Sequence, residues 1–144
     1  MDWKKEAAQK LRDYEKRKAA QKTSGSELAA LRDELRTVRS SLDGEPRRKS
    51  RTTADDVLVT LLALIDEQGK AAEINSRWVD NVEQALRCLT PEQYRVLELF
   101  YIHPAKGNVD VLCSELHIEI ATAYRRRDEA LRAFTLALYG ATET

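Results

Sequence analysis

Three consecutive arginines, Arg125 to Arg127, are the residues of this chain whose type and spacing point most clearly to chemistry. Guanidinium groups donate paired hydrogen bonds to phosphate oxygens and to the major-groove edge of guanine. Arg125, Arg126 and Thr122 share one side of a helix expected from about Ile120 to Tyr139. The apolar residues fall on the other side of this helix, at Ala123, Ala130, Leu131 and Phe134. We therefore expect Arg125 and Arg126 to contact DNA, with Thr122 beside them.

Two further residues are candidates for the same task. Tyr124 either contacts a phosphate or sugar or flanks the core, and the sequence leaves both open. Arg95 lies on a preceding helix, where it either contacts a phosphate or forms a salt bridge to Glu92 or Glu98. Arg127 is one turn beyond Ala123, so its stem is expected to pack on the domain while its charged head points outward.

The elements that must position these side chains are clearly delimited. Thr90-Pro91-Glu92-Gln93 combines a capping threonine, a proline at the first helical position and a glutamine that completes a capping box. His103-Pro104 ends that helix, because the residue before proline is disfavoured in the α conformation. A short helix from about Val109 to Leu116, a tight turn and the arginine-bearing helix follow. This order is typical of a helix-turn-helix whose last helix enters the major groove.

Residues 112–123, Leu112-Cys113-x-x-Leu116-His117-Ile118-Glu119-x-x-Thr122-Ala123, resemble the helix-turn-helix in the fourth region of bacterial sigma factors. Leu89 to Leu97 resembles the helix that precedes that motif. The continuation from Tyr124 to Leu131, followed by Tyr139-Gly140, is similar to phage-encoded ArpU/RinA-type regulators of late-gene transcription. The resemblance implies a promoter-binding regulator of phage or prophage that acts with the host RNA polymerase.

The chain departs from that family's pattern around the turn. His117 replaces the usual glycine, and Glu119 replaces the usual serine cap. Ile120 and Ala121 follow at the start of the recognition helix, and neither forms a side-chain hydrogen bond to a base edge. Base recognition must then come from further along the helix or from contacts with thymine methyl groups.

The N-terminal half is expected to be helical as well. Trp3, Ala7, Leu11 and Tyr14 mark one amphipathic helix, which Thr23-Ser24-Gly25-Ser26 is expected to break. A second helix carries an apolar stripe at 3-4 spacing, formed by Leu28, Leu31, Leu35, Val38 and Leu42. The stripe predicts either a coiled-coil homodimer or a helical hairpin within one chain.

A linker is expected over residues 43–53, followed by a long helix from about Ala54 to Leu89 with a possible break near Gly69. The basic linker residues Arg47, Arg48, Lys49 and Arg51 are either solvated or form an arm that contacts phosphates. The chain then divides into residues 1–53, the connecting helix 54–89 and a DNA-binding module 90–140.

Composition favours an all-α protein without catalytic or metal chemistry. The chain has 144 residues, 42% hydrophobic and 33% charged, with five glycines and three prolines. Its formal net charge is zero, but residues 1–53 carry 15 basic and 9 acidic side chains, while residues 90–144 carry 6 and 8. The two cysteines and two histidines lack metal-ligand spacing, and no phosphate loop or nucleophile motif occurs. We expect no enzyme, cofactor, metal or membrane segment, and a location in the bacterial cytoplasm with reduced core cysteines.

The sequence thus predicts a sequence-specific transcription regulator that binds double-stranded DNA at promoters with host RNA polymerase. The alternative is a phage DNA-packaging or coiled-coil assembly adaptor, similar to a small terminase subunit, that uses the same motif to bind DNA.

Overall fold

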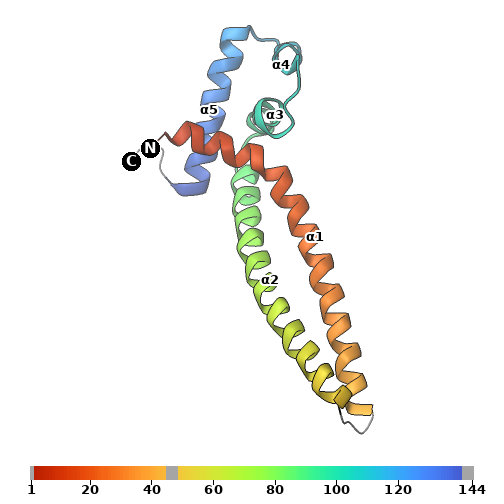
Figure 1. Ribbon diagram of the computed structural model, residues 1–144. Coiled ribbons are helices and arrows are strands. Elements are labelled where there is room, and N and C mark those ends of the chain that lie inside the picture. The colour runs from red at the N-terminus through yellow and green to blue at the C-terminus, as the bar shows by residue number, and fades with distance from the viewer. Residues whose placement is uncertain (1, 45–48, 141–144) are drawn as a thin grey trace. The chain divides into compact units, whose positions relative to one another are not determined.

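The computed structural model of the protein is all-helical, with about 90% of the chain in helices. It describes residues 2–44 and 49–140, and no strand occurs within these ranges. Figure 1 shows the order of the elements, which are α1 (Trp3–Gly44), α2 (Lys49–Arg87), α3 (Pro91–Leu97), a π-helical segment η1 (Glu98–Ile102), α4 (Asn108–Leu116) and α5 (Ile120–Tyr139).

The chain forms two compact units, and both long helices contribute to each of them. Unit 1 comprises residues 1–18 and 78–144, and unit 2 comprises residues 19–77. The beginning of α1 is therefore grouped with the C-terminal helices rather than with the rest of the N-terminal half. The boundaries of the two units do not coincide with the divisions at residues 53 and 89 that were expected from the sequence.

Unit 1 contains the larger core, to which all five α-helices contribute. Its fully buried side chains include Leu11 of α1, Val79 and Val82 of α2, Leu112 of α4 and Phe134 of α5. Each of these side chains is at most 1% exposed. Because the start of α1 supplies Ala7, Leu11 and Tyr14 to this core, residues 1–18 belong to the module that carries α3 to α5.

Helix α1 is continuous across Thr23-Ser24-Gly25-Ser26, so the predicted break is wrong. Two of the polar side chains bond back to the helix itself. Thr23 Oγ1 donates to the carbonyl of Ala19 at 3.2 Å, and Ser26 Oγ donates to the carbonyl of Lys22 at 3.3 Å. These hydroxyls therefore need no turn to find acceptors, and the cost of one glycine, about 1 kcal/mol, does not end a helix that packs on both sides of it.

Unit 2 consists of the second part of α1 and the first part of α2, which run side by side in opposite directions (Figure 1). Leu28 is 7% exposed, and the other four residues of the predicted stripe are half-buried. Gln21 Nε2 donates to Ser76 Oγ at 2.9 Å near one end of the pair.

Between Val57 and Ile65, most of the large apolar side chains of α2 are exposed. Among the described residues of unit 2, Leu61 is the one buried hydrophobic side chain that α2 supplies. Its large hydrophobic side chains that remain exposed are Val57, Val59, Leu62, Leu64 and Ile74. Two helices have too little surface to cover a wide apolar face on both flanks.

The predicted linker over residues 43–53 is also wrong in extent, because α1 reaches Gly44 and α2 begins at Lys49. Lys49 to Thr53 contains neither glycine nor proline, and lysine and arginine are good helix formers. Arg47 and Arg48 lie outside the described residues, and for Lys49 and Arg51 the structure describes the backbone helix alone. Helix α2 also continues through Gly69 without a break.

Candidate nucleic-acid interface

Helix α3 begins at the capping box that the sequence predicts. The backbone N–H of Gln93 donates to Thr90 Oγ1 at 3.1 Å, and the backbone N–H of Thr90 donates to Gln93 Oε1 at 3.0 Å. The helix passes into the π-helical segment η1 and ends at His103, whose N–H bonds to the Glu98 carbonyl at 2.7 Å.

The loop before α4 is held by Asn108. Its Nδ2 donates to the backbone carbonyls of Leu99 and His103, both at 2.9 Å. Asn108 is the first residue of α4 rather than its cap, because Gly107 occupies the cap position with a φ of 85°. The loop therefore fixes α4 against η1 through a side-chain amide.

A three-residue turn, residues 117–119, joins α4 to α5. His117 ends α4 in the left-handed conformation, with φ 56° and ψ 49°, and is the one non-glycine residue with positive φ among the described residues. Glu119 caps α5 in an extended conformation without a side-chain hydrogen bond to the helix. Its carboxylate still lies at the positive end of the helix dipole.

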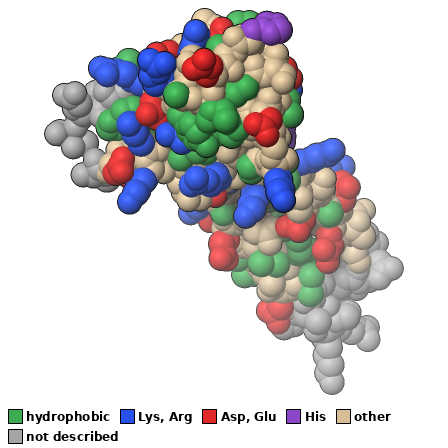
Figure 2. Space-filling view, turned by 90° about the horizontal axis from the view of Figure 1, so that it is seen from above, with side chains coloured by type: hydrophobic (Ala, Val, Ile, Leu, Met, Phe, Trp, Pro, Cys, Tyr) green, Lys and Arg blue, Asp and Glu red, His purple; other side chains and the backbone are tan. Residues whose placement is uncertain are grey.

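Helix α5 is buried along one side and exposed at its start on the other. Ala123, Ala130 and Phe134 are 0% exposed. Four residues of the first two turns, at i, i+1, i+4 and i+5 spacing, are exposed and share one side of the helix; we call them the α5 face, and they are Ile120, Ala121, Tyr124 and Arg125. Figure 2 looks onto the end of unit 1 where α4 meets α5, and it shows hydrophobic side chains gathered there between charged ones.

The arginines that were expected to contact DNA differ in their partners. Arg125 is exposed, and its Nη2 donates to Thr122 Oγ1 at 3.2 Å. Arg126 instead donates from Nη1 to Glu92 Oε1 at 2.5 Å and so ties α5 to α3. Among the described residues, no carboxylate pairs with the guanidinium of Arg125.

Arg95 is held by two carboxylates. Its Nε and Nη2 donate to the two oxygens of Glu115 at 2.9 and 2.6 Å, and its Nη1 donates to Glu98 at 2.8 Å. The hydrogen bonds that Arg95 donates, first to Glu115 and then to Glu98, raise the pKa of Arg95, and the same pairing lowers the pKa of Glu115. The expected bridge to Glu98 is present, but Glu92 pairs with Arg126 rather than with Arg95. Glu115 lies on α4, 20 residues after Arg95, so no helical periodicity connects these two residues.

Tyr124 of the α5 face packs against Phe100 and Arg127. The Tyr124 ring lies 5.7 Å from the Phe100 ring, and the Arg127 guanidinium lies over both rings at 5.1 and 5.6 Å. Arg127 also pairs with Asp128 at 3.1 Å. Tyr124 is 41% exposed, so one side of its ring packs on the protein while the rest faces solvent.

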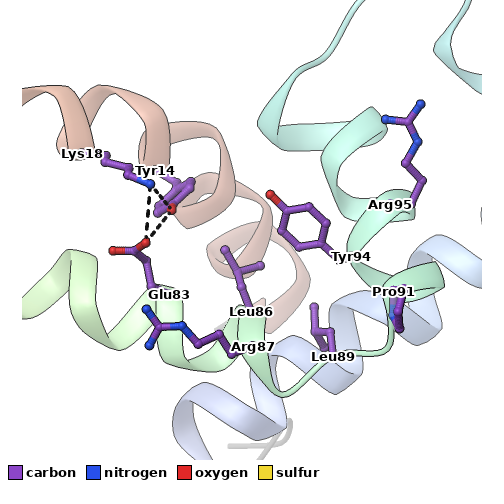
Figure 3. Close-up of a pocket in the computed structure, with 9 residues that line it drawn as sticks. All are labelled: Tyr14, Lys18, Glu83, Leu86, Arg87, Leu89, Pro91, Tyr94 and Arg95. Atoms are coloured by element: carbon purple, nitrogen blue, oxygen red, sulfur yellow. Dashed lines mark hydrogen bonds and ion pairs between the residues drawn. The ribbon is translucent and has the colours of Figure 1, made fainter.

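A separate pocket of about 570 Å³ opens in unit 1 between α1, α2 and α3 (Figure 3). On one side of it, Lys18 Nζ donates to Tyr14 Oη at 3.3 Å and Tyr14 donates to Glu83 Oε2 at 3.1 Å. Burial, first of all, raises the pKa of Tyr14 and that of Tyr94, which lines the same pocket. Lys18, Tyr14 and Glu83 thus satisfy one another on this side of the pocket.

Metal-ligating side chains do not come together in the part of the chain that the structure describes. Neither does any helix there have the length and apolarity to cross a membrane. Cys113 is half-buried but Cys88 is exposed, which corrects the expectation that both cysteines belong to the core.

Comparison of the chain with protein-family models, with curated proteins and with solved structures found no match.

Proposed function

We propose that the protein binds double-stranded DNA through α4, the turn and α5, used as a helix-turn-helix with α5 in the major groove. The observation that carries the proposal is the α5 face, which is exposed on the second helix of the pair while the opposite side of that helix is fully buried. A recognition helix needs this arrangement, because its first residues contact base edges while its other side is fixed to the domain.

The charges of the module favour sequence-selective DNA binding over high non-specific affinity. Arg95 and Arg126 are paired with carboxylates, which leaves Arg125 as the main cation of the α5 face. Because non-specific affinity rises with the number of phosphates neutralised, we expect this module to bind random DNA weakly and with a shallow salt dependence. A second contact is then needed, and the basic segment around Arg47, Arg48, Lys49 and Arg51 is our candidate.

The resemblance to sigma-factor and ArpU/RinA-type modules supports a role in transcription, with host RNA polymerase as the protein partner. A regulator of this kind acts as a monomer on polymerase or as a homodimer on its own site. Within one chain Leu28 is buried and the other four residues of the stripe are half-buried. A second copy would therefore add to the cover that α2 already gives the stripe.

The proposal is tested by selection of bound fragments from a random-sequence duplex pool, using the full-length protein. Enrichment of a common motif is the expected result, and failure to enrich any motif would remove the proposed function. Light scattering on the same preparation separates the alternatives, since a monomer or dimer supports the regulator, whereas a large ring supports the packaging adaptor.

A further inference from the structure

The α5 face is unusual for a DNA-reading surface because most of it is apolar. Ile120 is 56% exposed and Tyr124 is 41% exposed, and Ala121 between them is exposed as well. Helix α4, which packs on α5, also carries an exposed apolar side chain, Val111 at 43% exposure. Ile120, Ala121 and Tyr124 lie in the first two turns of α5, whose buried side carries Ala123, Ala130, Leu131 and Phe134.

Apart from Arg125, the polar groups that usually read bases are missing from this face. Asparagine and glutamine, which pair with adenine, do not occur in α5. Arg126, which could pair with guanine, is engaged with Glu92, and Arg127 lies over the rings of Phe100 and Tyr124. The face therefore offers one guanidinium, that of Arg125, beside a run of hydrocarbon.

The major groove has one apolar feature that such a surface can recognise, the C5-methyl group of thymine. When an isoleucine side chain or the edge of a tyrosine ring contacts that methyl group, apolar surface on both partners is withdrawn from water, which favours the complex. Cytosine, which lacks the methyl at the same position, gives no such gain. The single cation next to the hydrocarbon complements the phosphates or a guanine that flank the thymines.

We propose that Ile120 and Tyr124 read thymine methyl groups, so that the target site of this protein is thymine-rich where α5 lies in the groove. This inference rests on the proposed function, of which it specifies the substrate. Ile120 and Tyr124 are then the specificity-determining residues, and Arg125 sets the register of the helix on the duplex.

The test uses a duplex recovered by selection and a set of copies of it. In each copy, uracil replaces thymine at one position. Uracil keeps the hydrogen-bonding edge of thymine and lacks only the methyl. The wild-type protein is expected to bind the uracil duplex about fourfold more weakly for each methyl that is read, since burying one methyl contributes about that factor. The Ile120→Ala variant is expected to bind the thymine duplex more weakly and to lose the discrimination at one position.

The matched control is Leu136→Ala, which removes a hydrophobic side chain of similar exposure, 44%, near the other end of the same helix. This variant should keep the wild-type preference for thymine. Equal binding of the selected duplex and its uracil copies by the wild-type protein would overturn the inference and leave the proposed function standing. Uracil sensitivity that persists in Ile120→Ala at every position would overturn the assignment to Ile120, whereas absence of any selected duplex would remove the proposed function itself.

Discussion

Arg126 and Glu92 are joined across two helices by a hydrogen bond of 2.5 Å between Nη1 and Oε1. The two residues are 34 positions apart, and their side chains are 42% and 44% exposed. The bond fastens the second turn of α5 to the first turn of α3, and it neutralises an arginine that was expected from the sequence to contact DNA. Glu92 therefore limits how much positive charge this side of the module presents.

Replacing Glu92 by glutamine is expected to strengthen DNA binding. The change frees the Arg126 guanidinium and removes one negative charge, while a surface pair of this kind contributes only about 0.2–1 kcal/mol to stability. We expect affinity for all duplexes to rise by about threefold at low salt, with a steeper salt dependence. Fluorescence anisotropy over a salt series measures both quantities.

Glu73→Gln is the matched control for that variant, because Glu73 forms a similar exposed pair with Arg77 in unit 2. It makes the same change in net charge at a place that we do not assign to DNA. If both variants raised affinity equally, net charge rather than the release of Arg126 would explain the effect.

Arg125→Ala is expected to weaken binding to the selected duplex by about 1–3 kcal/mol if Arg125 contacts a guanine. The preference at one base position should relax at the same time, while the helix content seen by circular dichroism stays constant. Arg32→Ala, which removes an exposed arginine from α1, serves as the control for the loss of one charge. Unchanged affinity of the Arg125 variant would remove this residue from the interface.

Neutralising Arg47, Arg48, Lys49 and Arg51 together, with glutamine at each position, should lower affinity for all sequences alike. The slope of log affinity against log salt should flatten by up to about 0.9 for each phosphate that the variant no longer neutralises. A changed sequence preference with an unchanged slope would instead indicate that this segment reads bases in the minor groove.

Local signals in the sequence were sufficient to predict the helices that carry the proposed interface. Helix α5 runs from Ile120 to Tyr139 as predicted, and its predicted apolar residues, among them Ala130 and Phe134, are buried. The Thr90–Gln93 capping box is also confirmed. Each of these features depends on residues within one or two helical turns, and periodicity and capping chemistry report such short distances directly.

Features that depend on distant partners could not be derived in the same way. The pairs Arg126–Glu92 and Arg95–Glu115 join residues 34 and 20 positions apart, so no spacing rule connects them. The continuity of α1 through Gly25 is a further case, because packing of α1 on both sides of the glycine outweighs its low helix propensity. Tertiary contacts therefore decide which arginines remain available, although the sequence locates them correctly on the helix.

The start of α1 changes how the N-terminal half can be tested. Ala7, Leu11 and Tyr14 are buried in the core of unit 1, so deleting residues 1–53 would remove part of the module that we propose to bind DNA, as well as the apolar stripe. Point substitutions in the full chain are the sounder choice for separating assembly from DNA binding.

Thr90→Ala is expected to destabilise unit 1 by about 1 kcal/mol, because the N–H of Gln93 loses its acceptor at the start of α3. Urea unfolding followed by circular dichroism measures the loss, which for a chain of this length corresponds to a lower melting temperature by about 2–5 °C. Thr37→Ala is the matched control, since the Thr37 hydroxyl donates only to the Asp33 carbonyl within an exposed stretch of α1. Alanine has the higher helix propensity, so that control should be neutral or slightly stabilising. Equal losses from the two substitutions would show that removal of a hydroxyl, rather than of the cap, accounts for the effect.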